Sequence, residues 1–417
     1  MSKWIAGVAA LVLAIVPLSS LRAEEPKPDT KTDASQGFVT FTSGDNSLTL
    51  GAWGQFRAVV DDRELYDNDT AGSGLGEEDG ASTSLSIPRM RIYVQGNVYK
   101  PWLKYKIEVE VASLRTDANN NLNNGRITDG YFEVAKNPHA TVRVGQYKMP
   151  FGLQELVSDT RQEFVDRSIT SAKFAPSRDV GVMLWGLFAD KKFGYQLGLF
   201  NGGGQNNPQD DQALLHVVRV WYDPFGEYKL MESATDNPAH HQLHIALAYR
   251  GGETTKGTAT AGVFEDPNNE TALACEIAWK YKRFFAMAEV FQQTDEQANP
   301  TVGPDVDAQG WHAQFGVMVQ PKVQEVAIRL AEVEPDKDVD EAEQEEWRLV
   351  YGYFWRSHGM KLQADYGEIK YGENFATLSS LATRNINPGL DAAKRLAVLP
   401  GQKLTDKQLR AQFVVAF

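Results

Sequence analysis

The chain has 417 residues, a formal net charge of −13 and a single cysteine, Cys275. Nucleic acids bind to basic surfaces, so this acidic chain is not expected to have a nucleic-acid partner. One cysteine can form no internal disulfide and offers no cysteine-based metal framework. His240, His241 and His244 have metal-like spacing, but on a strand they do not all share a face, so we interpret them as polar lumen or turn residues and expect no metal site and no cofactor.

Residues 1–23 have the features of a secretory signal peptide. Lys3 gives a positive start, an apolar run continues to Leu18, and Ala23 offers a small residue for cleavage. The apolar run of about 15 residues is short compared with the roughly 20 that span a membrane, which favours cleavage over an uncleaved anchor. We therefore expect an exported chain.

Residues 24–46 start with a polar, proline-bearing stretch that is typical of a flexible leader, here expected in the periplasm. Residues 47–417 show no composition shift that would mark a domain boundary, although a chain of this length often has two or three domains. We expect one domain over this range.

From Ser47 onward, apolar and polar residues alternate over segments of about ten positions, which predicts strands. Sixteen segments fit this pattern: 47–59, 85–99, 102–113, 126–136, 139–148, 179–188, 193–200, 212–222, 240–250, 271–281, 283–292, 309–320, 322–333, 345–356, 359–370 and 407–417. Bacterial barrels have even strand numbers, and sixteen strands leave an aqueous lumen.

The connections between these segments alternate in length. Short turns such as Lys100-Pro101 and Gln320-Pro321 alternate with long loops such as 149–178, as in a barrel whose termini are periplasmic. A soluble sandwich, the alternative fold, gives no reason for this alternation. Residues 223–239 break the rule, because they are too long for a periplasmic turn, and the strand register there stays open.

The last strand ends the chain on Phe417, with Leu409, Ala411, Phe413 and Val415 on the same face. A terminal strand that is apolar on one face and ends on an aromatic is typical of the closing strand of an outer-membrane barrel. We therefore predict an all-β fold, a transmembrane antiparallel β-barrel of about 16 strands, in which this strand pairs with the first.

Parity along the first five strands places a group of basic side chains on the inner wall. We predict that these residues line the pore and bind anions: Arg57, Arg89, Arg91, Lys104, Lys106 and Arg143. Rings of Arg and Lys select anions in pores, and the guanidinium fork suits an oxyanion. In the alternative interpretation the lumen is simply polar, and these bases are balanced by Glu108, Glu110, Asp129 and Glu133.

The third external loop, residues 149–178, is too charged to form a core and is suited to fold inward and narrow a wet lumen. An ordinary extracellular loop is the alternative. The candidate pore-lining bases of this region are Lys148, Arg161, Arg167, Lys173 and Arg178.

Four blocks in this region resemble the phosphate-selective porin O and P family of Gram-negative outer membranes: Val144-Gly-Gln-Tyr-Lys-Met-Pro-Phe-Gly-Leu-Gln-Glu155, Phe164-Val-Asp-Arg-Ser168, Phe174-Ala-Pro-Ser-Arg-Asp-Val-Gly-Val182 and Leu199-Phe-Asn-Gly202. The resemblance implies a sixteen-stranded, usually trimeric barrel that passes phosphate or other small anions. Only Lys148, Arg167 and Arg178 carry over as members of the shared blocks.

The chain departs from the dense basic ladder expected of that family. Its later strands place mixed or neutral residues inside, among them Glu276, His312, Gln314, Gln363 and Asp365. Phosphate selectivity is therefore less well supported than porin identity.

We predict a porin of the Gram-negative outer membrane, in contact with lipid and lipopolysaccharide, through which small, phosphate-like anions diffuse passively. The alternatives are a weakly selective general diffusion porin and a surface-adhesion or structural barrel. An enzymatic role is not expected, because no GxSxG, HExxH or P-loop motif occurs and no catalytic residues stand out.

Overall fold

The computed structural model describes residues 39–66, 82–112, 126–207, 214–254, 268–296, 305–379, 382–383, 401 and 403–417. The expected signal peptide and the leader up to residue 38 lie outside the described residues. No helix among the described residues is long and apolar enough to cross a membrane.

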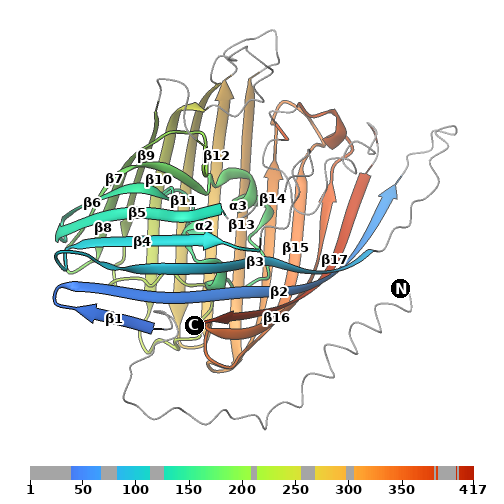
Figure 1. Cartoon of the computed structure of the whole chain (residues 1–417). Helices are drawn as coiled ribbons and strands as arrows, with labels where there is room; N and C mark the ends of the chain where they lie inside the picture. Colours follow the sequence, from blue (N-terminus) through green and yellow to red (C-terminus); the bar gives the residue numbers. More distant parts are fainter. Residues whose placement is uncertain are drawn as a thin grey trace.

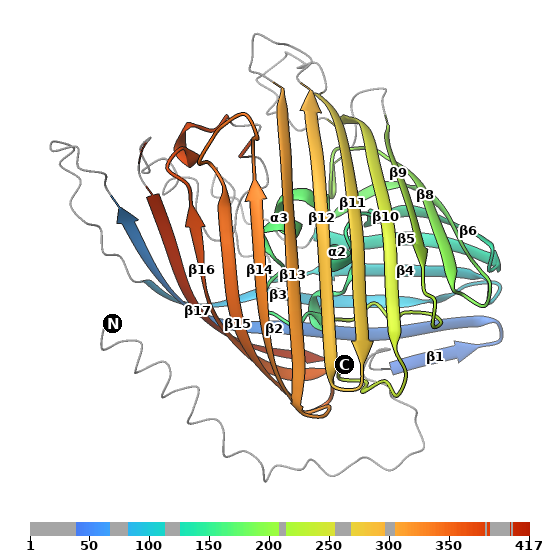
Figure 2. The same cartoon turned by 180° about the vertical axis from the view of Figure 1, so that it is seen from behind.

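The described strands β2 to β17 form one closed antiparallel barrel, which Figures 1 and 2 show from opposite sides. The first eight are β2 Asn46–Tyr66, β3 Ser82–Asn97, β4 Leu103–Glu110, β5 Arg126–Asn137, β6 Ala140–Lys148, β7 Arg178–Phe188, β8 Phe193–Phe200 and β9 Leu215–Tyr222. The second eight are β10 Gln242–Thr254, β11 Asn268–Tyr281, β12 Phe284–Glu296, β13 Val306–Gln320, β14 Gln324–Glu334, β15 Gln344–Phe354, β16 Met360–Tyr371 and β17 Lys403–Ala416. Each of the sixteen predicted strands has its counterpart among them, so the predicted barrel is confirmed.

The barrel closes where β17 pairs with β2, with Phe413 opposite Phe56. Beyond the last strand residue, Phe417 and Ala52 exchange two backbone hydrogen bonds of 2.8 and 2.9 Å. The terminal strand is therefore the closing strand, as its pattern predicts, and it leaves no open edge between the first and last barrel strands.

A short strand, β1 (Val39–Ser43), precedes the barrel and pairs with the start of β2. It lies in the range for which the sequence predicts a leader without strands. Gly44, at φ 56°, supplies the left-handed turn, and β-branched and aromatic residues such as Val39 and Phe41 favour the extended chain.

The two faces of the barrel differ as parity predicts. Large apolar side chains such as Leu247, Ile277 and Val290 are exposed on the outer face, where a lipid environment accommodates them. The inner face of the later strands carries buried polar residues, and the five mixed or neutral residues expected there are all buried: Glu276, His312, Gln314, Gln363 and Asp365.

Residues 149–177, between β6 and β7, contain the helices α2 (Leu153–Leu156) and α3 (Ile169–Phe174) and the 3-10 turn η1 (Asp159–Arg161). Both views place α2 and α3 within the outline of the barrel. We call residues 149–177 the constriction loop.

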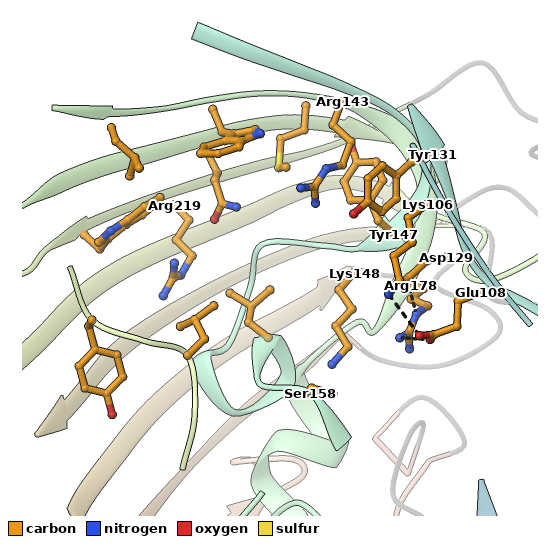
Figure 3. Close-up of a pocket in the computed structure, with 18 of the residues that line it drawn as sticks. Lys106, Glu108, Asp129, Tyr131, Arg143, Tyr147, Lys148, Ser158, Arg178 and Arg219 are labelled. Atoms are coloured by element: carbon orange, nitrogen blue, oxygen red, sulfur yellow. Dashed lines mark hydrogen bonds and ion pairs between the residues drawn. The ribbon is translucent and has the colours of Figure 1, made fainter. Parts of the chain in front are cut away.

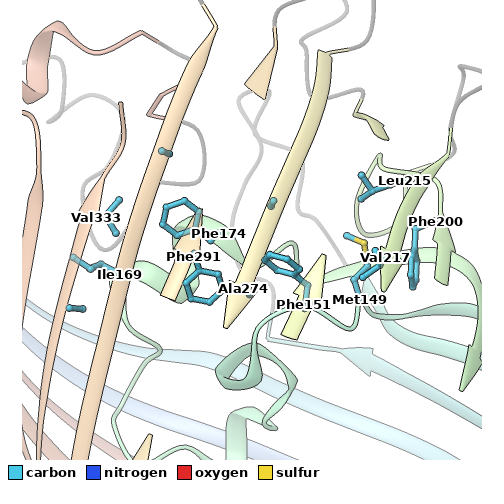
Figure 4. Packing of buried hydrophobic residues seen from close by; sticks show 14 of the residues in the cluster. Met149, Phe151, Ile169, Phe174, Phe200, Leu215, Val217, Ala274, Phe291 and Val333 are labelled. Atoms are coloured by element: carbon cyan, nitrogen blue, oxygen red, sulfur yellow. The ribbon is translucent and has the colours of Figure 1, made fainter. Parts of the chain in front are cut away.

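Apolar contacts attach the constriction loop to the inner face of β10–β14. Phe174 stacks on Phe291 of β12 with ring centroids 5.4 Å apart, and Ile169, Ala274 and Val333 belong to the same buried cluster (Figure 4). Thr170 adds a polar contact by donating to the backbone carbonyl of Trp311 at 2.9 Å. The loop therefore occupies the side of the lumen formed by the later strands.

The long turn that breaks the alternation of loop lengths is the segment between β9 and β10, residues 223–241, and its contacts explain its length. Tyr228 and Ala234 of this segment pack with Leu153, Phe285 and Met318 in a second buried cluster. The backbone N–H of Glu232 also donates to the carbonyl of Arg161 in the constriction loop at 3.1 Å. The predicted strands on either side were placed correctly, and the long turn has a packing role.

Candidate channel lumen and constriction

A cavity of about 460 Å³ lies between the constriction loop and the inner faces of β2–β10, on the side that the loop leaves open. Figure 3 shows much of its lining, with bases, carboxylates and aromatic rings arranged around one space. The basic residues in the lining are Arg91, Lys106, Arg143, Lys148, Arg178, Lys191 and Arg219. The acidic residues are Glu108, Asp129, Asp159, Asp223 and Glu227.

Asp166 of the constriction loop binds three guanidinium groups of the barrel wall. Its carboxylate lies 2.6 Å from Arg57, 3.4 Å from Arg89 and 3.3 Å from Arg410. Burial opposes ionisation of Asp166, but the charges of Arg57, Arg410 and Arg89 outweigh it and hold the pKa well below its ordinary value. The carboxylate therefore anchors the loop while it neutralises bases of the wall.

Asp159 makes a second anchor of the same kind. Its carboxylate lies 3.1 Å from Arg91 of the wall, 3.8 Å from Arg89 and 2.7 Å from Arg167 of the loop itself. Burial again opposes ionisation, and the charges of Arg167, Arg89 and Arg91 hold the pKa of Asp159 well below its ordinary value. Two loop carboxylates thus fix the constriction loop to β2, β3 and β17.

A ladder of ion pairs crosses the inner face of β3–β7. Lys106 lies 2.6 Å from Asp129, which also pairs with Arg178 at 2.8 Å. Along the same wall, Arg91 lies 2.9 Å from Glu110, and Arg143 lies 2.6 Å from Glu133. The four acids of the alternative interpretation, Glu108, Glu110, Asp129 and Glu133, all pair with bases of this wall, Glu108 with Lys106 at 3.2 Å and with Arg91 at 3.3 Å.

Predicted site residues fall into groups. Five of them line the cavity: Arg91, Lys106, Arg143, Lys148 and Arg178. Three others, Arg57, Arg89 and Arg167, form the anchors around Asp166 and Asp159.

The remaining three predicted residues have different surroundings. Lys104 has a side chain that is 55% exposed and lies 4.0 Å from Glu133, outside the cavity lining. Lys173 is buried and donates to the backbone carbonyl of Ala382 at 2.6 Å. Arg161 is partly buried on the constriction loop, and within the described part of the chain it forms no ion pair.

The lining also contains residues that the sequence pattern of the first five strands did not indicate. Arg219 of β9 lies 2.5 Å from Glu276 and 2.9 Å from the Nε2 atom of His244. The alternation Leu215, Val217, Arg219 places it on the inner face, so parity extended to β9 could have found it. Asp166, the loop residue that pairs with Arg410, could not be found in this way, because it lies outside the strands.

No group of three or more His, Cys, Asp or Glu side chains in the described residues could hold a metal ion. The charged groups of the lumen can instead attract, orient and pass a hydrated or partly dehydrated ion.

A model of the family described as phosphate-selective porin O and P matches residues 66–380, more than half of the chain. No curated protein sequence matches the chain.

Several solved structures have the same fold at low sequence identity. The anion-selective porin from Comamonas acidovorans is 12% identical with a TM-score of 0.52, and the match covers 89% of this chain and 100% of that one. The outer membrane channel DcaP of Acinetobacter baumannii is 12% identical with a TM-score of 0.54, over 91% of this chain and 100% of that one. The trimer form of OmpT of Vibrio cholerae is 13% identical with a TM-score of 0.50, over 89% and 99%.

Proposed function

The chain belongs to the phosphate-selective porin O and P family, and we propose that its lumen passes small anions, phosphate-like oxyanions among them, by passive diffusion. It is a channel of the Gram-negative outer membrane, with the fold of a porin. The proposal involves no covalent chemistry and no catalytic residue.

One observation carries the anion preference. Basic residues outnumber acidic ones in the cavity lining, and Lys148, whose contacts are mainly backbone carbonyls, is among them. Lys148 donates to the carbonyl of Val157 at 3.0 Å, and the nearest carboxylate oxygen, from Glu155, is 3.7 Å away. A lumen with surplus positive charge lowers the barrier for anions more than for cations.

A weakly selective general diffusion porin is the second candidate, and the ion pairs favour it. Most bases of the wall are paired with carboxylates, as Arg143 is with Glu133, so the net field along the lumen is smaller than the count of bases suggests.

The outside of the barrel would contact other subunits, lipid and lipopolysaccharide. By analogy with the trimer form of OmpT, we propose a homotrimer. The exposed apolar outer face, with residues such as Leu349 and Ile328, would contact lipid and neighbouring subunits, and the external loops would contact lipopolysaccharide.

Single-channel recording in a planar bilayer tests the function. Under a salt gradient we expect open channels whose reversal potential has the sign for anion preference, and added phosphate should change the current. A reversal potential near zero would support the general diffusion porin, and a cation-selective one would contradict the anion assignment. Absence of conductance from correctly folded protein would favour an adhesion or structural barrel.

A further inference from the structure

The cavity has an apolar side that simple inorganic ions do not require. Met183, Trp185 and Leu187 follow one another at alternate positions on the inner face of β7, and all three line the cavity. The outer face of β7 is also apolar at Val182 and Phe188, which are exposed. This strand is therefore apolar on both faces, although its inner face borders a polar lumen.

Other elements extend this apolar side. Trp221 of β9, Leu156 of the constriction loop and Leu230 of the segment after β9 line the same cavity. Apolar surface next to water has a free-energy cost that burial against another apolar group removes. A permeating molecule with an apolar part would gain this free energy, and inorganic phosphate would not.

The charged side of the cavity is held rigidly next to this apolar side. The guanidinium carbon of Arg143 lies 4.4 Å from the ring centroid of Tyr131 and 5.3 Å from that of Tyr147 (Figure 3). Its Nε and Nη2 atoms donate to Glu133 at 2.9 and 2.6 Å. The same carboxylate accepts from Nε1 of Trp185 at 3.3 Å, so one residue positions both the guanidinium and the indole.

Two buried tyrosine hydroxyls of the lining have no hydrogen-bond partner in the described part of the chain. Tyr147 is 2% exposed and Tyr228 is 6% exposed, and the Oη atoms of both are unpartnered. A buried hydroxyl without a partner has a cost of about 1–3 kcal/mol, and a bound water or ligand that accepts from it would remove that cost. These hydroxyls can donate to an oxyanion.

We propose that this cavity is a binding site for an organic anion with a flat apolar ring, of the aromatic carboxylate class. The ring lies against Trp185 and Trp221, and the carboxylate accepts hydrogen bonds from Arg143 and Tyr147. The volume of about 460 Å³ is in the range of sites for small organic ligands. The inference rests on the proposed function, because it names the class of anion that the same lumen prefers.

Current block in a planar bilayer tests the inference with four probes: benzoate, acetate, inorganic phosphate and benzyl alcohol. We expect benzoate to interrupt the current at a concentration at least about tenfold below that of the other three, because only benzoate has both the ring and the charge. Equal block by acetate or phosphate would overturn the role of the ring. Equal block by benzyl alcohol would overturn the role of the charge.

Variants locate the effect. Trp185→Ser should raise the blocking concentration of benzoate by about three- to tenfold, whereas Trp185→Phe should retain most of the block, because a ring remains. Trp355→Ser is the matched control, since Trp355 is exposed and lies outside the cavity lining. An equal loss of block in the control, or no loss in Trp185→Ser, would contradict the site.

Calorimetry separates this inference from the channel function. Benzoate is titrated into the folded full chain in detergent, where binding does not depend on conductance. Benzoate binding without conductance would support the site and contradict the porin function. Conductance without a preference for benzoate would support the porin function and contradict the site.

Discussion

Asp166 both neutralises bases of the pore wall and holds the constriction loop in place, because its carboxylate contacts Arg57, Arg89 and Arg410. The alternation along β2 and β3 is sufficient to identify Arg57 and Arg89 as inward-facing. It cannot identify their partner, because Asp166 is 109 residues from Arg57 in the chain and belongs to an irregular loop. Side-chain direction follows from strand period, but a contact across the lumen depends on the path of the loop.

Replacement of this anchor should expose positive charge. In Asp166→Asn, three guanidinium groups lose their shared counter-charge, and we expect the reversal potential to move toward stronger anion selectivity. Reversal potentials under a salt gradient measure the change. Asp338→Asn, at an exposed loop carboxylate, is the control. A shift of the same size in the control would show that the total charge matters and the anchor does not.

Replacement of Arg91 should change ion selectivity in the opposite direction. Arg91 lies 3.1 Å from Asp159, 3.3 Å from Glu108 and 2.9 Å from Glu110. Arg91→Gln removes one cationic partner from each of these carboxylates and leaves Glu110 with no other ion pair among the described residues, and breaking a buried pair costs up to about 3–5 kcal/mol. We expect a lower unfolding temperature in detergent together with a shift toward cation preference. An unchanged unfolding temperature would mean that water molecules replace Arg91 as hydrogen-bond partners of these carboxylates.

At the scale of elements, the constriction loop depends on a close approach to β13 at Gly316. A Cβ atom at this position would collide with the Oε1 atom of Glu163. Glu163 is 1% exposed, and its other carboxylate oxygen accepts from Gln314 at 2.9 Å. The sequence predicted the loop and its charge, but not this contact, because a glycine on the inner face of a strand has no distinctive pattern.

The close approach can be tested by adding one methyl group. Gly316→Ala should displace the constriction loop, so that proteolysis of folded protein cuts within residues 159–168 faster and the single-channel conductance rises. Gly226→Ala is a useful contrast, since a Cβ atom there has open space, although its φ of 106° strains the backbone. Equal cleavage rates in Gly316→Ala and the parent chain would contradict the contact.

The attachment of the loop should also depend on pH. Burial, followed by the charges of Glu325 and Glu232, raises the pKa of Glu163 well above its ordinary value. A raised pKa favours the docked loop below the ordinary carboxyl pKa, and this contribution is lost as the pH rises through the raised value. Asp159 and Asp166 act in the opposite sense, since their lowered pKa values favour docking until the pH falls through them.

We therefore expect the loop to detach more readily as the pH is raised from about 5 to about 9, a range that begins near the ordinary carboxyl pKa. Hydrogen exchange of amides in residues 159–168, corrected for the intrinsic pH dependence of exchange, measures this opening. Glu163→Gln removes one titrating group of the loop and should weaken the dependence in this range, while Glu289, which accepts from the backbone N–H groups of Leu153 and Gln154, remains. A dependence of unchanged size in this variant would show that Glu163 does not contribute to it.

At the scale of the whole molecule, the sequence predicted the architecture almost completely. Each strand carried its own alternation, and the loop lengths supplied the topology. The additional strand β1 was missed, because its five residues alternate too briefly to be distinguished from the polar leader. The sequence also did not predict that the constriction loop fills one side of the lumen and leaves the other side open, because this arrangement results from contacts of one loop with many strands.

The closing strand offers a test of the whole barrel. Deletion of Phe417 removes its two backbone hydrogen bonds with Ala52, each worth about 0.5–1.5 kcal/mol, together with the terminal ring. We expect a lower yield of folded barrel in lipid vesicles, measured by heat-dependent electrophoretic migration. Phe417→Tyr keeps the backbone and the ring and should fold as the parent does. Normal yield after the deletion would contradict the role of this residue in closing the barrel.

The anchors of the constriction loop also bear on the order of events during assembly. Asp166 binds Arg410, which is 244 residues further along the chain, and the backbone N–H of Val165 donates to Asp365, which is 200 residues further along. Contacts of such high sequence separation form late, because the chain between them must first be brought together. The narrow part of the passage is therefore expected to be completed only after the final two strands have joined the barrel, and an assembly intermediate without them would have a constriction loop that is not yet held in place.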